Sequence, residues 1–256
     1  MNGYSPFLKK EFFELYRKGR LLLFGILFTF FGILAPATAK ITPYIYKMLS
    51  DEFAQQGIIV GDVTITALNS WEQFFGNLPV LLIVFVIVCA GSVTNEFSKG
   101  TAVPLLTKGL SRTAMLLSKL TAAFLTWSVG YWAEVGICYG YTQYYWDNST
   151  VNDLFPSLLL WWLFSVFVIC TLFFFSAFAA TSTQVMLGTG AAVLIPYLVS
   201  IAEPAKKFLP TTLASGINFC NGSQSISDNI PAVIITAAAA VILASCAAFL
   251  IRKRKV

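Results

Sequence analysis

Residues 95–112, with the sequence NEFSKGTAVPLLTKGLSR, gather charged and polar side chains between two long apolar runs. The segment has an acid, Glu96, near its start and a base, Arg112, at its end, with Gly100 and Thr101 between them. These residue types are suited to ion pairing and to docking against another protein, because charged pairs fix orientation across an interface. The segment is therefore our first candidate for a functional site.

The middle of this segment predicts a short amphipathic helix. Thr101 is placed to cap a helix through PLLTK, with Pro104 in its first turn. Lys108 falls at the C-terminus of that helix, where a cation is favoured. Such a helix presents Leu105 and Leu106 as an apolar knob ringed by charge, and the alternative is a plain hairpin with a solvated surface.

A second distinctive residue is Glu134, the single charge between Leu120 and Tyr145. An acid at membrane depth costs a few kcal/mol, so it is a functional candidate by default. Cation or proton coupling needs such a carboxylate, whereas the structural alternative is pairing with a polar group on a facing helix. The same run has Gly136 and Gly140 in GxxxG spacing, which permits close contact between helices.

The sequence gives no support for catalysis by this chain alone. It has no histidine, which excludes Ser-His-Asp and Cys-His nucleophile systems. Its five cysteines form no CxxC pair, and we expect no disulfide framework and no metal site. No GxxxxGK[ST] loop is present to cradle ATP. We therefore expect no catalytic residue and no cofactor bound by the chain.

The composition indicates that these candidates are held in a membrane. Of the 256 residues, 57% are hydrophobic and 11% are charged, whereas a soluble domain has about 25% charged residues. A helical span needs about 20 apolar residues. The charge-free stretch 154–202 is too long for one span and fits two, joined near residues 181–184. We predict an all-α integral membrane protein with six spans, at residues 21–39, 76–94, 116–140, 156–180, 185–202 and 229–251.

The distribution of lysine and arginine predicts the orientation of these spans. Most of the 17 basic residues fall on the side that holds both termini and residues 95–112, so both termini are predicted to be cytoplasmic. The net charge of +5 is read as this topology signal, and we expect no nucleic-acid partner. The N-terminus lacks the pattern of a cleavable signal peptide. The predicted location is a bacterial plasma membrane, with multiple passes.

The flanking segments complete the predicted architecture. Residues 4–19 predict an amphipathic helix in the membrane interface, with Lys10, Glu14 and Lys18 four apart on a charged face that we expect to meet anionic lipid. The apolar stripe of this predicted helix consists of Phe7, Leu8, Phe12, Leu15 and Tyr16. The alternative is that residues 4–19 are a solvated segment that leads into the first span.

Two outward loops are predicted between the spans. Residues 40–75 are expected to form a small outer cap. Residues 203–228 are broken by Pro204, Pro210 and Gly216, and their apolar part would fit a hairpin that dips back into the outer leaflet. The basic RKRK tail that follows the last span is expected to anchor at cytoplasmic headgroups.

The pattern E-F-x-x-G-T-A-x-x-L-L-T-x-x-x-S-R, followed by S-K-L, resembles the cytoplasmic loop of ABC-2 type permeases. These are the membrane subunits of one class of ATP-driven exporters. The resemblance extends to the interfacial helix, the six spans, the broken outward segment and the basic tail. Leu110 stands where that family often has a proline. By resemblance, the loop is a coupling helix that seats in a separate ATPase, with coupling positions Glu96, Gly100, Thr101, Leu105, Leu106 and Arg112.

The resemblance also implies partners and a direction of transport. ATP and magnesium would be bound by the ATPase subunit, and a second permease subunit, identical or different, would complete a dimer in the lipid. The dense phenylalanines of LFGILFTFFGIL and WWLFSVFVICTLFFFSAF suggest a hydrophobic or amphipathic cargo, such as an antimicrobial or toxin peptide or a drug. The alternatives are an ion-coupled secondary transporter that uses Glu134, and a structural or sensory membrane protein.

Overall fold

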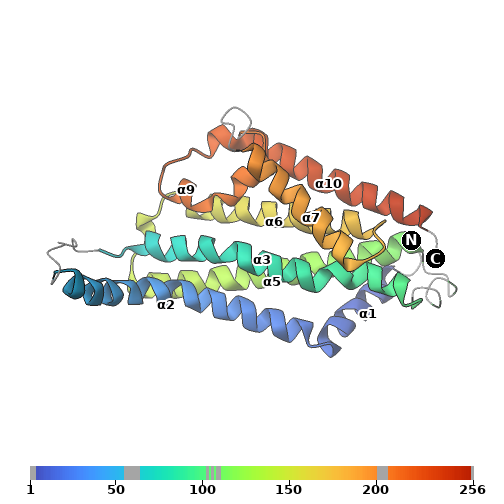
Figure 1. Cartoon of the computed structure of the whole chain (residues 1–256), viewed down its shortest axis with the longest axis horizontal. Helices are drawn as coiled ribbons and strands as arrows, with labels where there is room; N and C mark the ends of the chain where they lie inside the picture. Colours follow the sequence, from blue (N-terminus) through green and yellow to red (C-terminus); the bar gives the residue numbers. More distant parts are fainter. Residues whose placement is uncertain are drawn as a thin grey trace.

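The computed structural model describes residues 4–54, 64–101, 104, 107, 111–200 and 207–254, with the side chains of 49–54 excepted. The described residues form helices and short turns, and no strand is found among them. Most of the helices run side by side along the long axis of the molecule (Figure 1). The predicted coupling residues Leu105 and Leu106 lie outside the described residues, as do residues 55–63 and 201–206 of the predicted outward loops.

Six long helices stand where the sequence predicted six spans. They follow a short helix, α1 (Tyr4–Arg17), which matches the predicted interfacial helix at residues 4–19. Each predicted span falls mainly on one of the long helices. These are α2 (Arg20–Ala54), α3 (Ala67–Ser98), α5 (Arg112–Tyr145), α6 (Leu154–Ser176), α7 (Ser182–Val199) and α10 (Ile230–Lys253).

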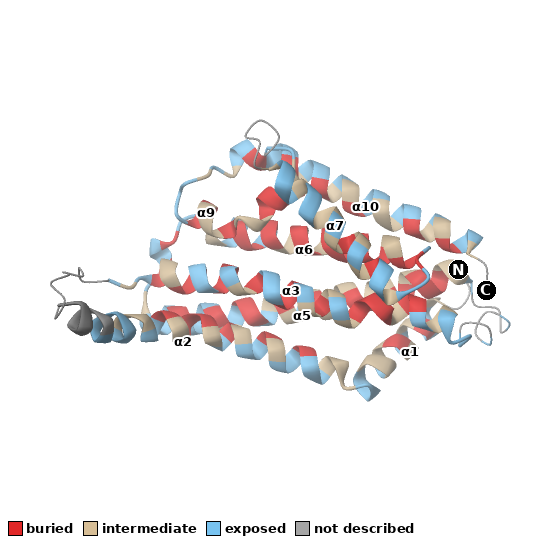
Figure 2. Ribbon diagram, viewed as in Figure 1, coloured by how far each residue is buried: buried red, intermediate tan, exposed pale blue. Residues whose placement is uncertain are grey.

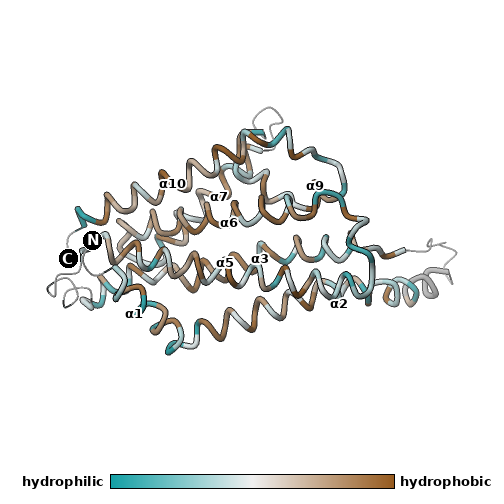
Figure 3. Tube along the Cα trace, turned by 180° about the vertical axis from the view of Figure 1, so that it is seen from behind, coloured by the Kyte–Doolittle hydropathy of each residue, from teal (hydrophilic) through white to brown (hydrophobic). Residues whose placement is uncertain are grey.

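Five of these helices, α2, α3, α6, α7 and α10, have both the length and the hydropathy of a membrane span. Helix α5 is 34 residues long but more polar, and it lies among the other helices, where it contacts α2, α3, α6 and α10. Hydrophobic residues fill the middle of the bundle and hydrophilic residues gather toward its two ends (Figure 3). This banding is what a helical membrane protein requires.

Helix α2 continues well past the predicted end of the first span at residue 39. It reaches Ala54, and α3 already begins at Ala67, so much of the predicted outward loop 40–75 is helical. Lys40 had marked the end of the apolar run, but its ammonium group lies over the Tyr145 ring, 3.7 Å from the centroid. A charge that leaves the hydrocarbon need not end the helix, because the backbone hydrogen bonds continue into the interface.

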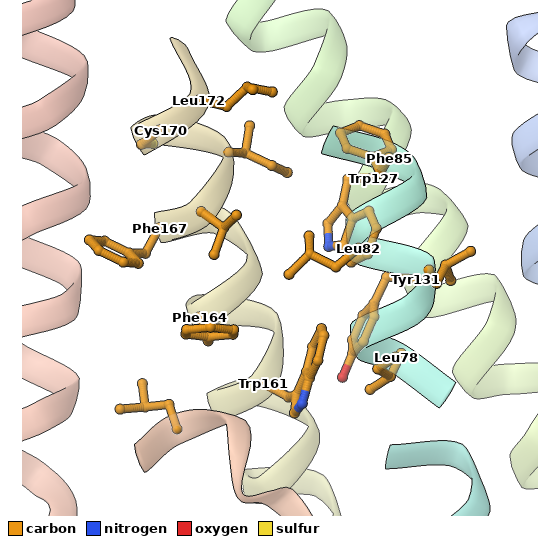
Figure 4. Close-up of a cluster of buried hydrophobic side chains, with 14 of the residues drawn as sticks. Leu78, Leu82, Phe85, Trp127, Tyr131, Trp161, Phe164, Phe167, Cys170 and Leu172 are labelled. Atoms are coloured by element: carbon orange, nitrogen blue, oxygen red, sulfur yellow. The ribbon is translucent and has the colours of Figure 1, made fainter. Parts of the chain in front are cut away.

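Aromatic side chains form the centre of the bundle where α3, α5 and α6 meet (Figure 4). Tyr131 of α5 stacks on Trp127 and on Trp161 of α6, with ring centroids 6.4 Å apart in both pairs. Two of the three polar groups are satisfied inside the core, since the Trp127 indole N–H donates to Ser165 Oγ (2.6 Å) and the Tyr131 hydroxyl donates to the Leu158 carbonyl (2.8 Å). The Trp161 indole N–H has no partner among the described residues. The stacked rings of Trp127, Tyr131 and Trp161 are therefore held both by packing and by two hydrogen bonds.

The phenylalanine-rich runs contribute to this core. Phe24, Phe28, Phe164 and Phe167 are all buried against neighbouring helices. In Figure 2 the buried residues lie on the faces that the helices turn toward one another, whereas the outer faces of α7 and α10 are exposed. These four phenylalanines therefore serve the packing of the bundle, whereas Phe30 and Phe178 of the same runs are exposed.

The segment before the last long helix is broken into short pieces, as its proline and glycine predict. It consists of the 3₁₀-helix η2 (Pro210–Ala214), α9 (Gly216–Cys220) and the 3₁₀-helix η3 (Ser227–Asn229). Leu213 and Phe219 are fully buried, and the pieces pack on α3, α6, α7 and α10. A Cβ at Gly216 would stand 2.3 Å from the Phe75 ring. The segment thus closes one end of the bundle.

Helices α2 and α5 approach closely at glycines other than the predicted GxxxG pair. A Cβ built at Gly130 would lie 2.1 Å from the Phe28 ring, and one at Gly32 would lie 3.1 Å from the Glu134 carbonyl oxygen. Gly136 and Gly140 are exposed, and a Cβ at either would meet nothing within 4 Å. The GxxxG spacing is therefore not used for packing within this chain.

We predict that Gly130→Val lowers the free energy of unfolding by about 2 kcal/mol, because overpacking a filled core typically costs 1–3 kcal/mol. Phe28 cannot move aside cheaply, since it is buried and its ring lies edge-on to Trp127. Gly136→Val makes the same backbone change on the same helix and should alter stability by less than about 0.5 kcal/mol. Thermal unfolding of the two variants in detergent is the measurement, and equal melting temperatures would contradict this packing.

Candidate functional site

Both chain termini, the end of α3, the start of α5 and helix α1 meet at one end of the bundle, called the terminal end below (Figure 1). Residues 95–112 connect α3 to α5 at this end. Six charged side chains from three helices come together here, and we call them the terminal cluster. Its members are Lys10, Glu11, Glu14, Lys18, Glu96 and Lys119.

Lys119 is the centre of the terminal cluster. Its Nζ lies 2.9 Å from Glu11 Oε2 and 2.9 Å from Glu96 Oε1, and only 3% of its side chain is exposed. Glu11 belongs to α1, Glu96 to α3 and Lys119 to α5. One buried ammonium group therefore joins three helices, with the helix that leads into residues 95–112 among them.

Lys10 extends the terminal cluster toward solvent. Its Nζ lies 2.8 Å from Glu14, 3.2 Å from Glu11 and 3.4 Å from Glu96, and Lys18 pairs with Glu14 as well. Partial burial alone would lower the pKa of Lys10, but the hydrogen bond to Glu14 and the three carboxylate charges outweigh it and raise that pKa.

The same ion pairs act on Glu14 in the opposite direction. Burial alone would raise the pKa of this carboxyl, but hydrogen bonds from Lys10 and Lys18 lower it to about 2. Glu14 is therefore ionised at neutral pH. The stability that these two ion pairs contribute to α1 is complete above the ordinary Glu14 pKa of 4.5 and is lost as the pH falls toward 2.

Helix α1 docks on the bundle through Glu11 and the aromatic residues before it, while Lys10 is partly exposed and Lys18 is exposed. That the charged face of α1 meets anionic lipid stays a prediction. Phe7 is buried beside the terminal cluster, with its ring centroid 4.7 Å from the Lys10 ammonium. The Tyr4 hydroxyl donates to Thr121 Oγ1 (2.9 Å). Tyr16, on the predicted apolar stripe, is 71% exposed. Lys10 reaches Glu96 of α3 (3.4 Å), whereas Glu14 pairs with Lys10 and Lys18 beside it on its own segment.

A second anchor holds the other end of residues 95–112. Ser111 caps α5, since its hydroxyl oxygen accepts from the Ala114 N–H (3.1 Å). The Arg112 guanidinium then donates to the carbonyl oxygens of Arg252 (3.2 Å) and Arg254 at the end of α10. The Ser-Arg pair of the sequence pattern therefore starts one helix and ties it to another.

Arg254 continues this second anchor to α6. Its guanidinium donates to the carbonyl oxygens of Ser176 (2.8 Å) and Ala179 (2.7 Å) and lies 4.3 Å from the Phe97 ring centroid. A cation is favoured at these carbonyls because they end α6. Burial lowers the pKa of Arg254 from its ordinary value, but an arginine stays charged at physiological pH. This part of the RKRK tail thus binds protein rather than the lipid headgroups predicted for it.

The described part of the connecting segment shows why Gly100 stands after α3. Gly100 has a φ of +67°, a conformation that favours glycine, and its N–H donates to the Phe97 carbonyl (3.1 Å). The Thr101 hydroxyl donates back to the Glu96 carbonyl (3.3 Å). Pro104 and Thr107 are helical, in line with the predicted short helix, while Leu105 and Leu106 lie outside the described residues.

Glu134 does not belong to the terminal cluster. It is fully buried on α5, and neither carboxylate oxygen has a hydrogen-bond partner in the described part of the chain. The predicted pairing with a polar group on a facing helix is therefore not seen. Cys138 and Thr142 lie one and two turns further along α5. The Cys138 thiol contacts Thr142 Oγ1 (3.8 Å), which lies 2.7 Å from the hydroxyl of Ser70 on α3.

The carboxylates of Glu11, Glu14 and Glu96 lie within 4.8 Å of one another. Three oxygens this close could hold a divalent cation. The ammonium groups of Lys10, Lys18 and Lys119 already lie against them, however, and balance their charge. The arrangement is that of an ion-pair network that joins helices.

Three residues of this end were missed as site residues from the sequence: Glu11, Lys119 and Arg254. Glu11 lies one helical turn after Phe7, so the buried face of α1 was visible in the spacing of an apolar and an acidic residue. Lys119 is part of the S-K-L triplet that completes the sequence pattern. No sequence pattern indicated the role of Arg254, because its carbonyl partners at Ser176 and Ala179 are distant along the chain.

Comparison with known proteins is consistent with this arrangement. The profile of a family described as "ABC-2 family transporter protein" matches residues 6–251. The chain is also similar to a Bacillus subtilis (strain 168) protein named "Uncharacterized transmembrane protein YxlG". The two are 22% identical over 215 residues, which cover 80% of each. The matched residues include α1, residues 95–112 and nearly all of α10.

We predict that Lys119→Met destabilises the protein by about 3 kcal/mol, because removing one partner of a buried ion pair leaves an uncompensated buried charge. Glu11 and Glu96 would then face each other without the ammonium group between them. Lys99→Met removes an exposed lysine from the same end and should cost less than about 0.5 kcal/mol. Thermal unfolding in detergent compares the two variants, and a Lys119→Met protein as stable as Lys99→Met would refute the central place given to Lys119.

Proposed function

Since this chain belongs to the ABC-2 family of transporter proteins, we propose that it is the permease subunit of an ATP-driven exporter and that residues 95–112 couple it to a separate ATPase. The ATPase would bind ATP and magnesium, and this chain would carry the cargo outward. The proposal places both termini and the terminal end in the cytoplasm of a bacterial cell, where an ATPase can reach residues 95–112.

The observation that carries this proposal is the double anchoring of residues 95–112. Glu96 at the start is paired with Lys119 of α5 and Lys10 of α1. Arg112 at the end is bonded to the last residues of α10, and Arg254 passes the contact on to α6. A displacement of this segment would therefore be transmitted through hydrogen bonds and ion pairs to five helices, α1, α3, α5, α6 and α10.

The proposed mechanism uses this linkage as a lever. Closure of two ATPase subunits on ATP displaces the connecting segments of two permease subunits, and the spans move between inward-open and outward-open arrangements. Such coupling requires two arrangements of the bundle whose balance depends on the nucleotide. The terminal cluster would move as a unit, because separating its buried charges is costly.

A second permease subunit is part of the proposal. Helix α7 contributes only two buried residues, Val185 and Thr189, to the chain's own core. Its apolar surface is left for lipid, cargo or another subunit, and we propose that the second subunit packs near it. The large exposed side chains of α7 are Leu187, Leu194, Ile195, Tyr197, Leu198 and Val199.

We propose a hydrophobic or amphipathic cargo, such as an antimicrobial or toxin peptide or a drug. The support is the apolar outer surface of α7 and α10 and the short links between most helices, which leave little room for an outer domain that binds large polar cargo. The dense phenylalanines no longer count toward this assignment, because Phe24, Phe28, Phe164 and Phe167 are core residues.

Coupling is tested by co-expressing this chain with the ABC ATPase encoded beside its gene. We expect the two to co-purify and the purified complex to hydrolyse ATP. Scrambling residues 101–110, with Glu96 and Arg112 kept in place, should abolish association or hydrolysis. Failure of the intact pair to associate, with both chains folded, would contradict the proposed partner.

Glu96→Gln tests the lever itself. Loss of the Lys119 link should lower transport per ATP by about fivefold or more, the size of a typical coupling energy, while the ATPase still binds. Glu72→Gln removes an exposed acid from the opposite end of the same helix and should leave transport unchanged. Transport and cargo-stimulated ATP hydrolysis in proteoliposomes are the measurements, and equal effects of the two variants would argue against coupling through Glu96.

Ion-coupled transport through Glu134 is a second candidate, favoured by the burial of a carboxyl whose oxygens have no partner in the described residues. If Glu134 exchanges a proton or cation, Glu134→Gln should abolish transport driven by an imposed ion gradient without reducing ATP hydrolysis. If it has a structural role, the isosteric glutamine should keep both activities. Parallel assays with an ion gradient alone and with ATP alone separate the two outcomes.

A further inference from the structure

A cavity of about 610 Å³ opens at the terminal end, bounded by α1, the start of α2, the end of α3 and the start of α5. This volume is within the range of sites that hold small molecules, about 300–1,000 Å³. The lining of the cavity combines apolar residues, among them Phe24, Phe85 and Phe173, with the charged residues of the terminal cluster. In Figure 3 the chain at this end changes from hydrophobic to hydrophilic. One part of the cavity wall therefore belongs to the hydrocarbon level and another to the headgroup level.

The inner part of the wall is aromatic. Phe24 of α2, Phe85 of α3 and Phe173 of α6 line it, together with Ala123 of α5. These side chains form a surface that favours the apolar portion of a ligand, because the transfer of apolar area out of water is favourable. An inorganic ion alone would gain nothing from them.

The outer part of the wall carries an excess of positive charge. Five basic and three acidic residues line the cavity, and the three acids are all paired with Lys10, Lys18 or Lys119. Arg20 and Lys99 remain, and neither side chain has a hydrogen bond or ion pair with any residue that the structure describes. The difference, five bases against three acids, leaves two cations available to a ligand.

Arg20 is directed into the cavity rather than toward bulk water. It is the first residue of α2, directly after Gly19, whose φ of +67° makes the sharp turn from α1. The side chain is only partly exposed, and it lines the cavity together with Phe24 and Cys89. A half-buried guanidinium without a carboxylate is costly, so this position favours an anion that the chain itself does not supply.

Two polar atoms of the lining residues also lack partners. Ser92 Oγ and Glu96 Oε2 are buried without a hydrogen bond from the described residues. Ser92 lies between the aromatic and the charged parts of the wall on α3. Its hydroxyl can donate to a phosphate oxygen or accept from a headgroup hydroxyl after a small side-chain rotation.

We propose that this cavity binds an anionic phospholipid from the leaflet at the terminal end. The phosphate would contact the guanidinium of Arg20, which suits phosphate geometry, and the ammonium of Lys99. The acyl chains would lie against Phe24, Phe85 and Phe173 and continue into the bilayer. The bound lipid would fill the space between α1 and the rest of the bundle. This inference does not rest on the proposed ATPase coupling.

The test uses the full chain alone, purified in a neutral detergent, with phosphatidylglycerol as the anionic probe and phosphatidylcholine as the zwitterionic one. Native mass spectrometry counts retained lipid during titration. We expect a preference for phosphatidylglycerol, and Arg20→Gln should weaken that binding about tenfold, because a charge-assisted hydrogen bond is lost. Equal retention of the two lipids by the natural chain would overturn the proposal.

Arg17→Gln is the matched control. Arg17 is exposed, lies at the same interface and does not line this cavity, so its loss should change affinity by less than about twofold, as expected for general surface attraction. Ser92→Leu should block binding with Arg20 intact, because it fills the cavity. Equal effects of Arg17→Gln and Arg20→Gln would assign the preference to general attraction and refute the site.

Two further arms identify the ligand and control for folding. Inorganic phosphate should fail to displace the lipid, and displacement at equal concentration would show a simple anion site instead. Arg20→Lys keeps the charge and should retain binding within about threefold. If Arg20→Gln lowers the melting temperature, weak binding by a stable Ser92→Leu protein supports the site, and undiminished binding by that variant refutes it. ATP hydrolysis enters none of these readouts, so their outcome is separate from that of the coupling experiments.

Discussion

The burial of the Lys119 ammonium group constrains how the terminal end is assembled. An isolated charge in a dry, low-dielectric place is costly, so it must be paired and hydrogen-bonded. Glu11 and Glu96 supply the pairs, each 2.9 Å away, and they come from helices α1 and α3. Helix α1 is also held by the buried Phe7 and by the Tyr4–Thr121 hydrogen bond, and this pairing adds a charged link to both α3 and α5. The geometry of the connecting segment depends on it in turn, since Glu96 stands at its start.

The long helices could be predicted from the sequence because few backbone structures are stable in hydrocarbon. Backbone groups must be satisfied within each segment, so long charge-free runs become helices. The method failed where a charge was taken as a boundary, as at Lys40, whose cation lies on Tyr145 while α2 continues to Ala54. It failed again at Gly136, because spacing alone cannot tell which helix face meets a neighbour. Gly130, which does meet Phe28, has no motif around it.

Only part of the candidate site could be predicted from the sequence. Glu96 and Arg112 were predicted, by resemblance, to be coupling positions at the ends of residues 95–112. The structure gives both of them contacts to other helices, and their coupling role stays a prediction. Their partners were not found, because Lys119 and Arg254 reach them only once α5 and α10 are folded beside α3 and α6. The burial of Glu11 on α1 was missed for the same reason, because its partner Lys119 lies on α5.

Buried charge is treated in two different ways along α5. Near its start, Lys119 is held by two carboxylates, and the helix is fixed to its neighbours there. Further along, Glu134 is equally buried but has no partner among the described residues. A fully paired group resists rearrangement, whereas an unpaired one gains free energy from any rearrangement that brings it water or a cation. A movement that starts at residues 95–112 would therefore leave the terminal cluster intact. It would instead change the packing of α2 against α5 near Glu134, where Gly32 of α2 lies close to α5.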